Sequence, residues 1–124
     1  MTALRILLAD DHTVVRQGLR KVLEERPEWQ VVAEAGDGRD AVRLAEEFRP
    51  DVAVVDVAMP LLNGIEATRQ IVDQVPGTTV FLCSTYQRAD LPPEAETSGF
   101  AAYVNKEELG PDLLRRLWEE RASA

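Results

Sequence analysis

The sequence predicts an α/β domain in which a five-stranded parallel sheet carries helices on both faces. Five short apolar runs alternate along the chain with segments of helical periodicity, and turn residues fall between them. Alternation of this kind is typical of parallel strands joined by crossover helices. The length of 124 residues suits one domain and is too short for two ordinary ones. We therefore predict a single domain over residues 1–124.

The predicted strands are short runs that are β-branched or aliphatic at successive positions. Continuous apolar runs are typical of parallel strands buried on both sides, whereas a half-exposed strand alternates polar and apolar residues. The five runs cover residues 4–9, 31–35, 52–55, 79–83 and 101–104.

The predicted helices carry apolar residues at the spacing of one helical face. The four clear stripes are Val15, Gly18, Leu19 and Val22; Ala41, Leu44, Ala45 and Phe48; Ile65, Ile71, Val72 and Val75; and Leu113, Leu114, Leu117 and Trp118. Pro27, Pro50 and Pro76 stand where a helix must end or has just ended.

The segment between the fourth and fifth apolar runs is the least helical. Pro92 and Pro93 fit only the first turn of a helix, and Ala95 is the only aliphatic residue from there to Ser98. A helix with one further turn is marginal in water, because nucleation is costly and few hydrogen bonds follow. We expect a short, weakly packed fourth helix and a mobile loop over residues 87–91.

Composition and charge exclude several classes of function. The net charge of −8 argues against direct binding of nucleic acid or anionic lipid, which both need a positive footprint. No apolar run approaches the roughly 20 residues of a membrane span, and the start of the chain does not resemble a signal peptide. One cysteine and one histidine exclude an intramolecular disulfide and a His-rich metal site. We expect a cytoplasmic protein.

Polar residues follow the apolar runs at the edge where a parallel sheet binds its ligands, beyond the carboxyl ends of its strands. The first run ends in Asp10 and Asp11, the third in Asp56 and the fourth in Ser84, and Lys106 follows the fifth. If the strand order is 2-1-3-4-5, the first and third strands are neighbours. The three carboxylates then converge, flanked by the serine and the lysine.

Three neighbouring carboxylates repel one another, and a hard divalent cation relieves the repulsion. Magnesium favours carboxylate oxygens, keeps several waters and commonly pairs with phosphate. A phosphoryl group arriving there would meet the metal, the Lys106 ammonium and the Ser84 hydroxyl. A carboxylate can itself be the nucleophile and form an aspartyl phosphate, and Asp56 stands at the centre of the set. The residues therefore predict phosphoryl chemistry with Mg²⁺ as cofactor.

Four stretches carry a recognisable pattern in a fixed order: LLADDHTVVRQGL, DVAVVDVAMPLLNGIEA, FLCSTY and YVNKEEL. Together, and at this spacing, they resemble the receiver domain of two-component response regulators over the full chain. The segment DDHTVVRQGLRKVLEE is most similar to the NarL/FixJ subfamily, the LuxR-type regulators. The resemblance implies a flavodoxin-like fold with strand order 2-1-3-4-5.

The resemblance also implies roles for the residues of the site. Asp56 corresponds to the phosphoacceptor, Asp10 and Asp11 to magnesium ligands, and the backbone carbonyl of Ala58 to a further ligand. Lys106 stands at the position of the family's site lysine. Such a receiver is not an enzyme in its own right, because it catalyses only its own phosphorylation and dephosphorylation.

Ser84 and Tyr103 stand at the two switch positions of the family. The resemblance implies that they report phosphorylation to the face formed by the fourth helix, the fifth strand and the fifth helix. The implied partner is a histidine kinase or a phosphotransfer protein. The sequence leaves open whether the chain forms a homodimer, and whether it is the N-terminal part of a LuxR-type transcription regulator.

Other interpretations of the same residues remain. The aspartate pair can cap a helix, Ser84 can be a plain strand-end hydroxyl, Tyr103 a half-buried strand aromatic and His12 a polar residue of a first helical turn. A haloacid-dehalogenase-like phosphatase uses a similar set but needs a second acid where Ala58 stands. A flavodoxin-like FMN carrier needs a phosphate-binding first loop. A phosphorylation-independent interaction module is the third alternative.

Three features depart from the family pattern. Ala58 replaces a larger polar residue, Glu107 follows the site lysine in place of the frequent proline, and Glu96 stands where a leucine is usually buried. With so weak a fourth helix, we expect partners on this face to depend more on the fifth helix, near Arg115 and Glu119.

Overall fold

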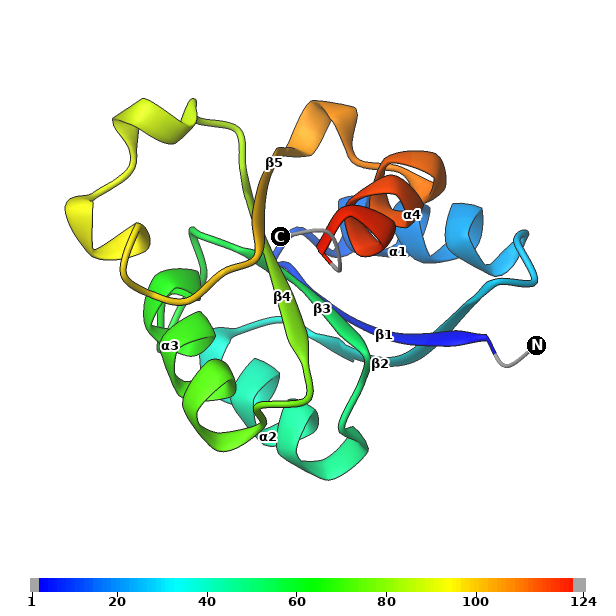
Figure 1. Ribbon diagram of the computed structural model, residues 1–124, viewed down its shortest axis with the longest axis horizontal. Coiled ribbons are helices and arrows are strands. Elements are labelled where there is room, and N and C mark those ends of the chain that lie inside the picture. The colour runs from blue at the N-terminus through cyan, green and yellow to red at the C-terminus, as the bar shows by residue number, and fades with distance from the viewer. Residues whose placement is uncertain (1–2, 122–124) are drawn as a thin grey trace.

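The computed structural model describes residues 3–121 and contains a five-stranded parallel sheet in the order β2-β1-β3-β4-β5 (Figure 1). The strands are β1 (Leu4–Ala9), β2 (Trp29–Ala35), β3 (Val52–Asp56), β4 (Thr79–Ser84) and β5 (Ala102–Asn105). The number of strands, their parallel pairing and their order are confirmed. The structure extends β3 and β4 by one residue, so that Asp56 and Ser84 are the last residues of their strands.

Four α-helices cover the sheet in the described residues. Helices α1 (Thr13–Glu24) and α4 (Pro111–Glu120) lie on one face, and α2 (Gly38–Phe48) and α3 (Gly64–Gln74) lie on the other (Figure 1). The result is the three-layer arrangement that the alternating pattern predicts. No helix among the described residues is long and apolar enough to span a membrane.

Each face of the sheet has its own hydrophobic core, because successive side chains of a strand point to opposite faces. In β1, Leu7 packs towards α2 and α3, whereas Ile6 and Leu8 pack towards α1 and α4. All five residues of β3 are buried. This explains the unbroken apolar run at residues 52–55 and places the last residue of β3 at the centre of the sheet edge.

The turn between β3 and α3 is closed by backbone contacts. The Gly64 amide donates to the Val57 carbonyl at 2.8 Å, and the Asn63 side chain caps α3 by accepting from the Glu66 amide at 2.9 Å. A Cβ atom at Gly64 would lie 1.9 Å from the Asp56 carbonyl oxygen. Only glycine therefore allows this turn to pass so closely behind Asp56.

Helix α1 forms as predicted, but its apolar stripe is only partly buried against the sheet. Val15 and Val22 are 49% and 44% exposed, Gly18 is exposed, and Leu23 is the buried residue of the helix. The stripe lines one side of a groove of about 230 Å³, which Leu109 borders from the segment before α4.

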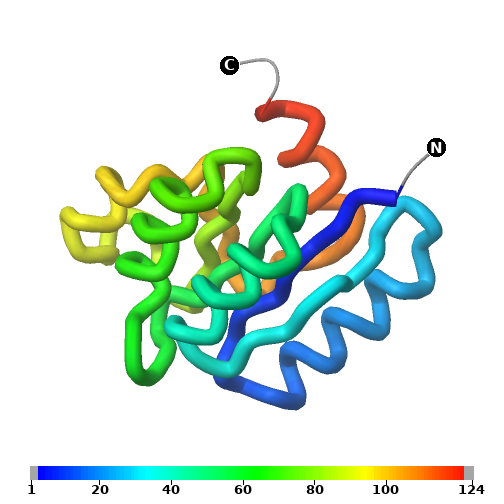
Figure 2. Tube along the Cα trace, turned by 90° about the horizontal axis from the view of Figure 1, so that it is seen from below, coloured from blue at the N-terminus to red at the C-terminus, as the bar shows by residue number. Residues whose placement is uncertain are grey.

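No α-helix forms between β4 and β5; two 3-10 turns, Arg88–Asp90 and Pro93–Ala95, replace it. Figure 2 shows this connection protruding at the opposite end of the molecule from α1. The fourth helix, which we expect to be short or degenerate, is thus degenerate, and α4 is the predicted fifth helix. Packing is not weak throughout, since Ala95 and Ser98 are buried, while Glu96 is exposed and pairs with Arg88. Mobility of residues 87–91 stays a prediction.

Candidate functional site

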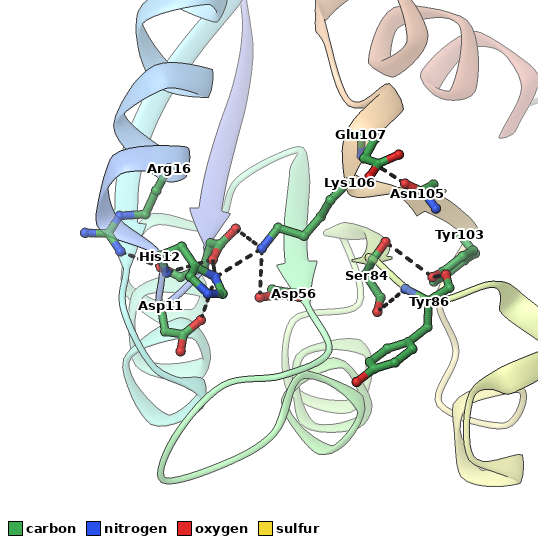
Figure 3. A network of polar contacts seen from close by, with 11 residues as sticks. Asp11, His12, Arg16, Asp56, Ser84, Tyr86, Tyr103, Asn105, Lys106 and Glu107 are labelled. Atoms are coloured by element: carbon green, nitrogen blue, oxygen red, sulfur yellow. Dashed lines mark hydrogen bonds and ion pairs between the residues drawn. The ribbon is translucent and has the colours of Figure 1, made fainter.

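The acidic residues meet because β1 and β3 are direct neighbours. The two strands pair from Ile6 with Val52 to Ala9 with Val55, so Asp10 follows one strand where Asp56 ends the other. Both carboxylates are buried at the carboxyl edge of the sheet. The convergence expected from a 2-1-3-4-5 order is thus present (Figure 3).

Lys106 lies between the two buried carboxylates. Its ammonium group is 2.8 Å from Asp10 Oδ2 and 3.2 Å from Asp56 Oδ2, and only 9% of its side chain is exposed. The lysine opens a 3-10 turn after β5, which Asn105 caps by accepting from the Glu107 amide at 2.9 Å. Proline, which is frequent at this position in the family, has no amide hydrogen to donate. Glu107 therefore allows a capping hydrogen bond that proline would not.

A fourth residue, His12, joins Asp10, Asp11 and Asp56, the three aspartates that form the acidic group. The Nδ1 atom of His12 is 3.2 Å from Asp10 Oδ1 and 3.2 Å from Asp11 Oδ1, and 3.3 Å from Lys106 Nζ. The interpretation of His12 as a polar residue of the first turn is off by one position, since His12 is the N-cap residue of α1, and it missed these contacts. The available signal was its position directly after the aspartate pair.

The donor set suits a hard divalent cation. Asp10, Asp11, His12 and Asp56 each offer one ligand atom, and all of these atoms lie within 4.8 Å of one another. Three of the four are carboxylate oxygens, which Mg²⁺ prefers. Two of the carboxylates are buried and Asp11 is exposed, so an ion held here would keep a side open to water.

The surroundings shift the pKa values of the two buried aspartates in opposite directions. Burial and the charge of Asp10 raise the pKa of Asp56, and Lys106 and the Ala58 amide offset this only in part. Burial acts in the same direction on Asp10, but hydrogen bonds from Lys106 and from the His12 amide outweigh it and hold the pKa of Asp10 below its usual value. Burial lowers the pKa of Lys106, yet its contacts with the two carboxylates raise it overall.

Ser84 and Tyr103 lie beside the acidic group and contact the segment after β4 (Figure 3). The buried Ser84 Oγ accepts from the Tyr86 amide at 3.1 Å. The Tyr103 hydroxyl donates to the carbonyl of Tyr86 and lies 3.5 Å from that of Ser84. The two predicted switch residues therefore converge on the backbone of Tyr86.

The chain belongs to the family of response regulator receiver domains, whose model matches residues 6–118. It is 36% identical over 104 residues to the transcriptional regulatory protein DegU of Brevibacillus brevis, covering 84% of this chain and 44% of that protein. It is 38% identical over 111 residues to the transcriptional activator DevR/DosR of Mycobacterium tuberculosis, covering 90% of this chain and 51% of that protein. The chain thus spans about half the length of the curated relatives it matches.

Solved structures agree with this assignment. The response regulator domain of Thermotoga maritima CheB superposes with a TM-score of 0.85 at 30% identity over 98% of both chains. The receiver domain of NarL from M. tuberculosis superposes with a TM-score of 0.88 at 25% identity over the whole of both chains. The chain is a flavodoxin-like receiver of the two-component type, related to NarL/LuxR-family regulators. This family is not a recognised catalytic one, and the rival interpretations are not favoured.

Proposed function

We propose that Asp56 accepts a phosphoryl group from the phosphohistidine of a histidine kinase or of a phosphotransfer protein. The observation that carries this proposal is the position of the Lys106 ammonium, which contacts both Asp10 and Asp56 at the edge of the sheet. A buried cation beside two carboxylates provides the charge that a transferred phosphoryl group needs.

In the proposed reaction, an Oδ atom of Asp56 attacks the phosphorus, and a P–O bond forms as the P–N bond to the donor imidazole breaks. The imidazole nitrogen leaves with the electron pair of that bond and takes up a proton. Burial of Asp56 holds its carboxylate in one orientation, which lowers the entropic cost of the attack. Lys106 balances the charge of the phosphoryl oxygens.

The same residues provide the metal site. Asp10, Asp11 and Asp56, with the backbone carbonyl of Ala58, would hold Mg²⁺. When bound, the ion would neutralise charge on the phosphoryl oxygens. We assign His12 no ligand role, because oxygen donors complete the set for a hard cation.

Ser84 and Tyr103 would transmit the change. A hydroxyl can donate one hydrogen bond while accepting another, so Ser84 can donate to a phosphoryl oxygen and still contact the Tyr86 amide. An acceptor present only after phosphorylation favours the conformation that makes this bond. Tyr103, which also contacts Tyr86, would report the shift to the segment between β4 and β5.

The printed names of the relatives describe transcriptional regulators, and the chain covers about half their length. We infer that the chain acts in the cytoplasm as the receiver of a LuxR-type regulator, alone or as a homodimer. Because this chain has a net charge of −8, we expect another part of such a protein to contact DNA.

The test is intact mass after incubation with acetyl phosphate, with Mg²⁺ or with EDTA. We expect one added phosphoryl group in the presence of Mg²⁺, none with EDTA, and loss of the group on hydroxylamine treatment. Asp56→Asn should remain unmodified. Asp73→Asn, an exposed aspartate of α3, is the matched control and should behave as the wild type. Modification of Asp56→Asn at the wild-type level would contradict the assignment.

A further inference from the structure

One side chain of α1 reaches the backbone of the acidic group. Arg16 donates through Nη1 to the carbonyl oxygen of Asp10. The amide of Asp10 donates to the Ala35 carbonyl of β2 at 3.0 Å. The peptide groups on both sides of Asp10 are therefore held, one by the neighbouring strand and the other by Arg16.

The guanidinium of Arg16 is itself fixed in place. Its Nε atom is 3.0 Å from Glu34 Oε1 in β2, and the other carboxylate oxygen of Glu34 pairs with Arg20. The side chains of Arg16 and Glu34 are only 15% and 18% exposed. A planar guanidinium held through two of its nitrogens has one orientation, which a lysine ammonium could not reproduce.

Apolar packing provides little alternative support for this end of α1. Val14 is 83% exposed and Val15 is about half exposed, so neither anchors the first turn of the helix to the sheet. A cavity of about 20 Å³, large enough for one water molecule, lies between α1 and the strands, with Asp10 and Arg16 in its wall. The first turn of the helix, before Leu19 reaches the core, therefore depends on polar contacts for its position.

We propose that Arg16 is a positioning residue that holds the Asp10–Asp11 turn in the geometry required to bind a divalent cation, with Glu34 orienting it. The inference rests on the proposed function, since it assigns Arg16 to the same Mg²⁺ site. Groups that orient metal ligands typically contribute 10–100-fold to metal affinity.

A positioning role for Arg16 and a simple effect of its charge predict opposite changes in Mg²⁺ affinity when the residue is replaced. Removing a positive charge near a cation site should strengthen Mg²⁺ binding, because a repulsion is lost. Removing a residue that orients the ligands should weaken it. Arg16→Met decides between them, since methionine keeps an apolar stem of similar length and removes both the charge and the donors.

The experiment is calorimetric titration with Mg²⁺ of wild type, Arg16→Met, Arg16→Lys and Arg43→Met, with unfolding midpoints measured in EDTA. We expect Arg16→Met to weaken Mg²⁺ binding about tenfold or more, and Arg16→Lys to weaken it by a smaller factor. Arg43, an exposed residue of α2 paired with Asp40, controls for the change in net charge, and its variant should bind Mg²⁺ as the wild type does.

Unchanged or tighter binding in Arg16→Met would overturn the role of Arg16, even if its unfolding midpoint falls. If Arg16→Met does not fold, Arg16→Lys decides: weaker binding supports the role, and wild-type affinity overturns it. A wild type that binds no Mg²⁺ would overturn the phosphoacceptor function as well, so the two failures are distinguishable.

Discussion

The acidic group at the ends of β1 and β3 and the connection between β4 and β5, which begins at the same edge of the sheet, are built differently. In the first, buried charges contact one another, with Lys106 within 3.2 Å of two carboxylates. In the second, residues 85–101 form two 3-10 turns joined by the exposed pair of Arg88 and Glu96.

The difference shows how each region is stabilised. The backbone behind Asp56 packs so closely that a Cβ at Gly64 would lie 1.9 Å from the Asp56 carbonyl oxygen, so we expect Asp56 to keep its position before any ligand arrives. The connection buries Ala95 and Ser98, and Arg88 spans it by contacting Glu96 and lying 5.0 Å from the Phe100 ring centroid. Regions with few buried apolar contacts open at lower free energy, so we expect the connection to move when the acidic group changes.

The close backbone packing behind Asp56 can be disrupted by a substitution at Gly64. Gly64→Ala should lower the free energy of unfolding by about 3 kcal/mol, because its Cβ would lie 1.9 Å from the Asp56 carbonyl oxygen. Gly18→Ala is the control, since a Cβ there meets nothing within 4 Å. Alanine in the α1 interior should stabilise the protein by about 0.5–1 kcal/mol. Urea denaturation measures both, and equal effects would contradict the role of Gly64.

The unfavourable burial of the charged Asp56 carboxylate predicts that the stability of the protein depends on pH. A carboxyl whose pKa is raised by folding favours the folded state below its unfolded pKa, and this contribution is lost as pH rises through the folded pKa. The pKa of Asp56 is raised, so without Mg²⁺ Asp56→Asn should be more stable than wild type at neutral pH. The difference should shrink on approaching about pH 4. Thermal melts in EDTA across this range, with Asp73→Asn as control, would refute the idea if the difference grew towards acid.

The loop beside Asp56 holds a second source of strain. Leu61 is exposed and has a φ of 66°, a left-handed conformation that costs a non-glycine residue about 1–2 kcal/mol. After the entropic cost of glycine, Leu61→Gly should stabilise the protein by about 0.5–1 kcal/mol. Leu61→Ala removes the exposed side chain but keeps the strain, so a similar gain in both variants would count against the backbone explanation.

The smallest predicted effect concerns the connection. Arg88→Gln should accelerate hydrogen exchange at the amides of Ala95, Glu96 and Ser98 and leave β3 unchanged, because it removes the pair with Glu96. Even in wild type, these amides should exchange faster than those of β3. Arg115→Gln, which removes an exposed pair within α4, is the control. Faster exchange throughout the sheet in Arg88→Gln would show that the two regions do not differ as described.

The strands could be predicted from local sequence, and the acidic group followed from them once the strand order 2-1-3-4-5 was assumed. An apolar run predicts a strand, and the residue that ends it must stand at the sheet edge, so Asp10 and Asp56 follow once β1 and β3 are neighbours. The weakness of the fourth helix was also predictable, because Pro92 and Pro93 restrict the backbone locally.

The contacts that orient the group could not be found in this way. Arg16 meets Glu34 only after α1 has packed beside β2, and His12 approaches Lys106 across 94 positions of sequence. The exposure of Val15 and Val22 is likewise decided by how α1 sits on the sheet, since the stripe itself is that of an ordinary buried helix.

Backbone amide NMR on adding beryllofluoride and Mg²⁺ most directly tests whether Asp56 receives the phosphoryl group and the β4–β5 connection responds. We predict shifts at Asp56 and Lys106 together with shifts at Tyr86 and Ala95. In Ser84→Ala the first pair should persist and the second should diminish. Saturating shifts at Asp56 with Tyr86 and Ala95 unmoved in wild type would contradict the coupling, and no shift at Asp56 would contradict its role as phosphoacceptor.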